Sequence, residues 1–132
     1  MLWLRNFWLF ALWVAIILYL SFTPLTGWPK VGAFEKLYFD KLVHVAMYAI
    51  LCFLLIRGIF KQTGSRATVA SIITAVVFCS AMGTAIEFLQ PQLTLYRQFE
   101  IADIVADLIG ALAGFCLFSW IRKKRWLGLN AS

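Results

Sequence analysis

The sequence predicts an all-α membrane protein, a four-transmembrane-helix bundle formed by one domain over residues 1–132. Three observations predict this fold: 63% of the residues are hydrophobic, only 14% are charged, and the apolar residues gather in four long runs. A bilayer core about 30 Å thick needs roughly 20 apolar residues in a helix. Each run approaches that length, and a water-soluble domain would not use so many apolar residues.

The limits of the four runs follow from the residues between them. We expect transmembrane helices over residues 7–22, 42–60, 67–89 and 101–121. Pro24 and Pro29 interrupt the chain after the first run, the polar stretch KQTGSR separates the second from the third, and Pro91 is expected to end the third. No small-x-small cleavage site follows the first run, so we interpret it as a retained helix.

The cysteines indicate no disulfide or metal chemistry. Cys52, Cys79 and Cys116 all lie inside the apolar runs, and no two of them form a C-x-x-C pair. We therefore expect them to pack as small apolar side chains.

The basic residues predict the orientation in the membrane. Eight of the twelve Lys and Arg residues lie before the first run, around the second connection and after the fourth run: Arg5, Arg57, Lys61, Arg66, Arg122, Lys123, Lys124 and Arg125. Four spans place these regions on one side, which the positive-inside rule assigns to the cytoplasm. We expect both termini in the cytoplasm, a multi-pass protein of the cytoplasmic (inner) membrane, and contacts with anionic lipid but not with nucleic acid.

The acidic residues all fall toward the opposite, extracytoplasmic side: Glu35, Asp40, Glu87, Glu100, Asp103 and Asp107. A charge at the centre of a transmembrane helix costs about 2.5–3.5 kcal/mol on insertion scales, so these side chains are not expected to face lipid. Four of these acids form an inner set, Asp40, Glu87, Asp103 and Asp107. Their negative charges outnumber the positive charges nearby, which are those of Lys41, Arg97 and at most His44. We expect the acids to pair, share protons or line a wet cavity, with Arg97 as the principal bridging cation.

Helical spacing predicts that the second and fourth helices turn polar stripes toward the bundle. Asp40, His44 and Tyr48 recur every four residues, and so do Asp103 and Asp107. Because a stripe of ionisable residues is costly in lipid, both stripes should face the interior.

The third and fourth helices carry small residues beside their polar ones. Glu87 and Gln90 are three residues apart, and Gly83 lies one turn before Glu87. Gly110 and Gly114 continue the acidic face of the fourth helix, and small residues allow helices in membranes to approach closely. These three glycines are therefore predicted helix-packing positions around a polar site.

These residues also resemble a family. The stretches DKLVHVAMY, EFLQ and YRQFEIADIVADLIGALAG, together with SFTP at the end of the first run, are similar to the VanZ-like family of small bacterial integral membrane proteins. The matching positions are Asp40, Lys41, His44, Glu87, Gln90, Arg97, Asp103, Gly110 and Gly114. The family has Asn where this chain has Asp107. The resemblance implies a cell-envelope context, since the namesake is associated with resistance to the antibiotic teicoplanin, but it implies no reaction.

The polar site fits three interpretations, which the pattern leaves open. In the first, an enzyme acts on a lipid head group or envelope precursor: Asp40 orients His44 as a general base, Arg97 holds a phosphate or carboxylate, and Glu87 is the acid. No serine or cysteine is close in the pattern, so a water-using reaction fits best. The candidate catalytic residues are His44, Asp40, Glu87 and Asp103, and the candidate binding residues are Arg97, Gln90, Lys41, Asp107 and Tyr48.

The other two interpretations involve no turnover. The same cavity would serve a binding or transport protein for a lipid, an antibiotic or a proton, or the charges would be structural ion pairs that fix the helix ends. No cofactor is expected, because the spacing matches no metal motif; a divalent cation on Glu87, Asp103, Asp107 and His44 is the weaker option. The expected partners are membrane lipids and, in the first interpretation, a lipid-linked envelope precursor; the pattern indicates no oligomeric state.

Overall fold

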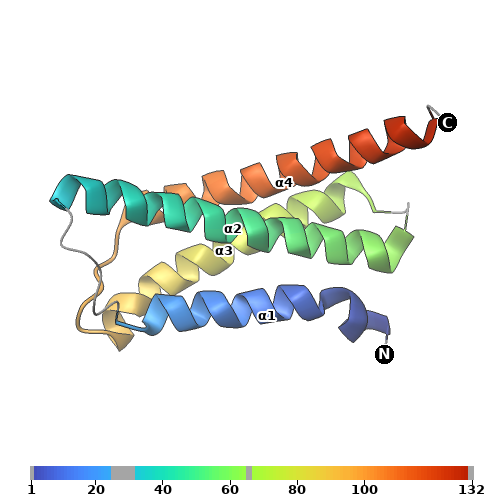
Figure 1. Ribbon diagram of the computed structural model, residues 1–132. Coiled ribbons are helices and arrows are strands. Elements are labelled where there is room, and N and C mark those ends of the chain that lie inside the picture. The colour runs from blue at the N-terminus through green and yellow to red at the C-terminus, as the bar shows by residue number, and fades with distance from the viewer. Residues whose placement is uncertain (1, 25–31, 65–66, 131–132) are drawn as a thin grey trace.

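The computed structural model describes residues 2–24, 32–64 and 67–130, and these form four helices. They are α1 (Leu2–Phe22), α2 (Ala33–Thr63), α3 (Val69–Leu93) and α4 (Ile101–Asn130). Figure 1 shows them as long rods that run back and forth, with the two termini at the same end. Each contains an apolar segment long enough to cross a membrane. The predicted four-transmembrane-helix fold is confirmed.

The helices extend beyond the apolar runs. Asp40 and Lys41 lie inside α2, and the basic stretch that begins at Arg122 lies inside α4. Lys and Arg are good helix formers, so the helix continues where the hydrophobicity stops. Local signals set the other limits: α2 ends before Gly64, whose φ of 64° favours glycine, and the Thr68 hydroxyl accepts a hydrogen bond from Ser71 N at the start of α3.

The prediction that Pro91 ends the third helix is wrong, because α3 continues through Pro91 to Leu93. Proline removes only its own N–H from the helix, which here would bond the carbonyl of Glu87. Both the N–H and the hydroxyl of Thr94 donate to the carbonyl of Gln90, at 2.9 and 2.6 Å, and complete the last turn. The helix therefore includes Gln90, whose side chain reaches the end of α1.

Helices α2 and α4 run parallel and form the most extensive contact of the bundle. A Cβ atom added to Gly110 would collide with the backbone carbonyl of Val45, and one added to Gly114 would collide with that of Ala49. The two contacts have the same sequence offset, so α4 lies directly against the backbone of α2 over a full turn. Small residues permit this approach in a membrane.

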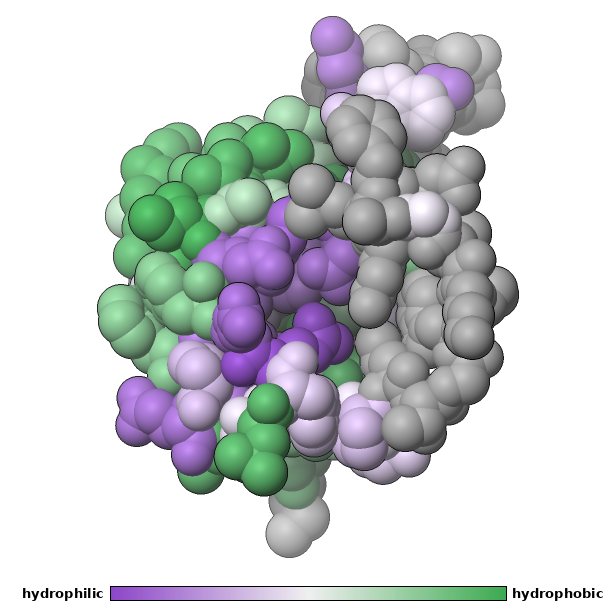
Figure 2. Space-filling view, turned by 90° about the vertical axis from the view of Figure 1, so that its left-hand side faces the viewer, coloured by the Kyte–Doolittle hydropathy of each residue, from purple (hydrophilic) through white to green (hydrophobic). Residues whose placement is uncertain are grey.

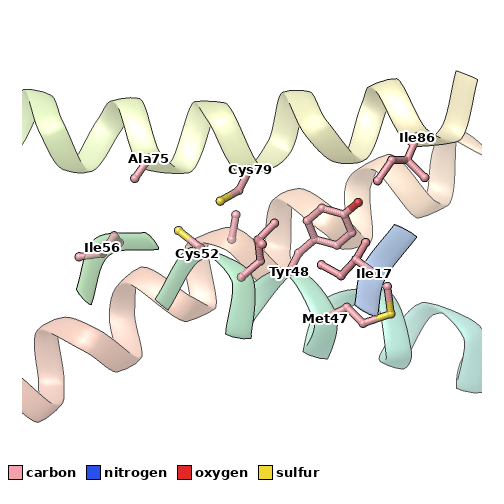
Figure 3. Close-up of a cluster of buried hydrophobic side chains, with 10 residues drawn as sticks. Ile17, Met47, Tyr48, Cys52, Ile56, Ala75, Cys79 and Ile86 are labelled. Atoms are coloured by element: carbon pink, nitrogen blue, oxygen red, sulfur yellow. The ribbon is translucent and has the colours of Figure 1, made fainter. Parts of the chain in front are cut away.

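The apolar core lies between the four helices. Its buried residues include Ile17, Tyr48, Leu51, Cys52 and Cys79, and Figure 3 shows the sulfur atoms of the two cysteines facing each other between α2 and α3. Both cysteines are free, as expected, and Cys116 is also free but exposed. Many large apolar side chains point outward, which suits helices surrounded by lipid.

The end of α1 is attached to the third helix and the loop that follows it. Gln90 Nε2 donates to the carbonyl of Ser21 at 3.0 Å, and the Tyr96 hydroxyl donates to the carbonyl of Phe22 at 2.6 Å. The last carbonyls of a helix have no partner within it, so these bonds satisfy two of them.

We predict that Gly114→Leu destabilises the bundle by about 1–3 kcal/mol or more, because the neighbouring backbone of Ala49 cannot move aside as a side chain can. Ala113→Leu is the matched control, since Ala113 is exposed on the same turn. Thermal unfolding in detergent measures both. Equal unfolding temperatures for the two variants would contradict the role given to Gly114.

Candidate functional site

The acidic end is the end of the bundle where α1 and α3 finish and α2 and α4 begin. Figure 2 views it directly and shows hydrophilic side chains gathered around a hollow with apolar groups beside it. The described acids at this end are Asp40, Glu87, Glu100, Asp103 and Asp107, against the cations Lys41 and Arg97. The structure thus brings the predicted polar residues together from three helices and one loop.

Lys41 is the cation that joins the carboxylates. Its Nζ donates to Asp103 Oδ1 and, at 2.6 Å, to Glu100 Oε2, and it lies 3.6 Å from Asp40 Oδ2. The expectation that Arg97 would bridge the acids is wrong for the described residues, where Arg97 Nη1 reaches only Asp40 Oδ1, at 3.7 Å. The parallel register of α2 and α4 explains the difference, because it places Lys41 beside the first turn of α4.

His44 lies between two carboxylates of α4. Its Nδ1 is 2.8 Å from Asp107 Oδ1, within hydrogen-bond distance, and its Nε2 is 3.9 Å from Asp103 Oδ2, which is too long for a hydrogen bond. We expected Asp40 to orient this histidine, but the structure gives that place to Asp107. Asp40 instead lies near Lys41 and Arg97.

Glu87 is the least compensated group of the site. Its side chain is 1% exposed, and neither carboxylate oxygen has a hydrogen-bond partner among the described residues. Asp107 Oδ2 is likewise buried without a partner there, and a Cβ added to Gly83 would collide with it. The glycine therefore lets α3 close over the carboxylate of Asp107. Burying a carboxylate without a partner is costly unless it takes up a proton or meets a cation.

A pocket of about 100 Å³ opens at the acidic end. Its polar lining comes from Ser21, Asp40, His44, Gln90 and Arg97, and its apolar lining from Leu20, Val43 and Met47. The end of α1, the first half of α2, the end of α3 and the following loop therefore contribute to one cavity. Of the four buried ionisable side chains of the site, His44, Glu87, Asp103 and Asp107, it is His44 that lines this pocket.

Two candidate binding residues have structural roles. Tyr48 is 1% exposed and lies in the apolar core, where its ring comes close to Gly83. Gln90 lines the pocket but uses its amide N–H to hold the end of α1.

Two residues of the site were not among the candidate site residues from the sequence, although Glu100 was counted with the acids of that side. Glu100, just before α4, accepts a hydrogen bond from Lys41; an acid three residues before Asp103 at a helix start was the available signal. Ser21 lines the pocket with His44, although the pattern suggested no serine nearby. No local signal in the sequence links Ser21 to His44, because only the packing of α1 on α2 brings these two residues together.

One group of side chains has the spacing of a metal site. Ligand atoms of Asp40, His44 and Asp103 lie within 4.8 Å of one another. This set differs from the one considered from the sequence, since it includes Asp40 and omits Glu87 and Asp107. The ammonium group of Lys41 already bonds Asp103, so a cation would have to displace it. The arrangement is therefore better suited to proton transfer and anion contact than to a resident metal.

Four helices that are long and apolar enough to span a membrane, with an acid–histidine cluster buried at one end, indicate a multi-pass membrane protein. The chain belongs to the VanZ/LLP1 family, whose model matches residues 3–122. It is also 35% identical over 86 residues to Uncharacterized protein C11E3.10 of Schizosaccharomyces pombe, so relatives are not confined to bacteria. The match covers 65% of this chain and 50% of the yeast protein, about half its length. No solved structure matches.

We predict that Lys41→Met destabilises the protein more than Arg97→Met. Loss of Lys41 leaves Asp103 and Glu100 without their cation, and breaking a buried pair costs about 3–5 kcal/mol, reduced here by partial exposure. Arg97 makes one long contact to a half-exposed acid, which is worth about 0–1 kcal/mol. Unfolding temperatures in detergent provide the comparison. The reverse order would show that Arg97 is the compensating charge.

We predict that Asp107→Asn is neutral or stabilising, whereas Asp107→Ala destabilises. The amide oxygen of Asn still accepts a hydrogen bond from His44 Nδ1, and the substitution removes a buried charge with an unpartnered oxygen. Alanine leaves the histidine without this partner. Thermal unfolding checks both variants, and an Asn variant that unfolds as readily as the Ala variant would mean that the negative charge itself is needed.

Proposed function

We propose that the acidic end binds the polar head group of a membrane lipid or of a lipid-linked cell-envelope precursor, and that His44 serves there as the base in a water-using reaction. One observation carries this proposal: His44 lines the same pocket as Arg97 while Asp107 holds its other ring nitrogen. A base and an anion-binding group thus face one small cavity.

The size and lining of the pocket favour a head group over a whole small molecule. About 100 Å³ is well below the 300–1,000 Å³ typical of sites for drug-sized ligands. Leu20, Val43 and Met47 line its apolar side. A ligand with a polar tip and an apolar remainder fits this combination, because the remainder can stay in the surrounding lipid.

The roles of the residues follow from their contacts. With the proton of His44 on Nδ1 and donated to Asp107, Nε2 is free to accept a proton from a water molecule. The resulting hydroxide oxygen attacks an ester or phosphoester of the head group, and the leaving oxygen takes the proton back. Arg97 is suited to hold the phosphate or carboxylate, since its planar guanidinium binds such groups with two hydrogen bonds.

The buried state of Glu87 argues against a purely structural cluster. Ion pairs that only fixed the helix ends would leave each buried carboxylate with a partner, as Asp103 has in Lys41. If the basic end faces the cytoplasm, the acidic end meets the outer leaflet, where envelope precursors are exposed. This orientation, in a bacterial inner membrane, agrees with the teicoplanin-resistance context that the family resemblance implies.

We predict that His44→Gln slows turnover strongly and that Arg97→Gln weakens binding. The proteins are placed in lipid nanodiscs with bacterial phospholipids and a polyprenyl diphosphate, and the lipids are followed by mass spectrometry. The wild-type protein should convert lipids of one head-group class into a product that mass spectrometry detects. His44→Gln should slow this by about 10²–10⁴-fold, the usual contribution of a general base, while still retaining the lipid. Gln62→Ala, at the opposite end, is the control.

The alternatives give different results. If the wild type retains a lipid without changing it chemically, the protein is a lipid-binding protein and not an enzyme. Loss of thermal stability in His44→Gln, with no head-group preference in the wild type, would indicate a structural cluster and overturn the proposal.

A further inference from the structure

A second, larger pocket lies at the basic end, where α2 and α4 finish and α3 begins. Its volume is about 850 Å³, within the range of ligand-binding cavities. Phe53 and Phe60 of α2 and Phe118 of α4 form its aromatic wall, with ring centroids 5.7 Å apart for Phe53 and Phe118 and 5.1 Å apart for Phe60 and Phe118. Figure 1 shows α4 diverging from α2 toward this end.

The rim of this pocket is basic and has no acid near it. Arg57, Lys61, Arg122 and Lys123 all line it. The sequence contains no Asp or Glu between residues 41 and 86 or after Asp107, so both helices reach this end without an acidic residue. The guanidinium of Arg122 lies 4.2 Å from the ring centroid of Phe60, which offsets only part of this positive charge. The rim is therefore complementary to an anion.

The order of residues along the helices identifies the kind of anion. On α2 the lining runs from Phe53 through Arg57 and Phe60 to Lys61, and on α4 from Phe118 to Arg122. The two helices are parallel, and the lining of each begins with a phenylalanine and ends with a basic residue toward the same membrane surface. A phospholipid changes in the same direction, from acyl chain to phosphate, and Arg and Lys side chains at this depth attract anionic lipids.

We propose that the basic-end pocket binds one anionic glycerophospholipid of the adjacent leaflet. The phosphate lies between Arg57 and Arg122, which donate charge-assisted hydrogen bonds to it. An acyl chain fills the aromatic part of the pocket. The site is at the end opposite His44, and it stands whether or not the acidic end is an enzyme.

The test uses the purified full-length protein and two lipids with identical acyl chains, phosphatidylglycerol and phosphatidylcholine. Native mass spectrometry measures occupancy, and thermal unfolding measures stabilisation. The wild type should bind phosphatidylglycerol in preference and unfold at a higher temperature with it. Glycerol 3-phosphate, which carries the phosphate without the chains, should give neither effect.

Two double variants separate the pocket from general surface charge. Arg57→Gln with Arg122→Gln should weaken phosphatidylglycerol binding about tenfold or more. Arg5→Gln with Lys124→Gln removes the same charge at the same end but outside the pocket; Arg5 is exposed on α1, and Lys124 stacks on Trp120 at 4.2 Å. This control should stay within about twofold of the wild type, since surface charges at a distance are screened.

Three results would overturn the proposal: equal binding of the two lipids by the wild type, equal losses in the two double variants, or stabilisation by glycerol 3-phosphate comparable to that by the lipid. If the Arg57/Arg122 variant does not fold, Phe53→Ala provides a second measurement. It should weaken the binding of phosphatidylglycerol while leaving the charges of the rim in place, and unchanged affinity in that variant would also refute the acyl-chain site.

Discussion

The close approach of α2 and α4 is the constraint on which the rest of this protein depends. Gly110 and Gly114 bring the backbone of α4 against the carbonyls of Val45 and Ala49, with the same sequence offset at both contacts. Two parallel helices held in this register place the preceding turns side by side. The first two turns of α4 then meet the stretch of α2 that carries Lys41 and His44, so the polar contacts follow from the glycine contacts.

The buried carboxylates of the polar site differ in whether they have a partner, and this difference bears on the chemistry of the site. Asp103 has the ammonium group of Lys41, but both oxygens of Glu87 and one of Asp107 are buried without a partner in the described part of the chain. In a low-dielectric setting, a buried carboxylate without a partner is more stable when it takes up a proton or contacts a cation than when it stays charged and unpaired. His44 contacts Asp107 in this interior and also lines the pocket, and this position supports the role of a base that we propose for it.

Charge divides the molecule into two ends with different chemistry. The acids gather where α2 and α4 begin, whereas Arg57 and Lys61 of α2 and the basic residues of α4 from Arg122 onward gather where these helices finish. The acidic end has a small cavity and the basic end a large one. Each cavity combines apolar and charged walls, as expected for contact with lipid at the two surfaces of a membrane. The two proposed ligands therefore differ in charge environment but share an amphipathic character.

The amino-acid pattern alone determined the four spanning helices, the separation of acids from bases and the glycine faces, because hydrophobicity and helical periodicity are local properties. It also suggested family membership, which the family model shows. Only the tertiary structure decided the partners: Asp107 rather than Asp40 beside His44, Lys41 rather than Arg97 among the acids, and Ser21 in the pocket. The reason is that spacing within one helix defines a face, whereas the pairing of faces depends on the register between helices far apart in the chain. The end of α3 was also not evident from the sequence: the helix continues through Pro91 to Leu93, and Gln90, just before this proline, carries the amide that holds α1.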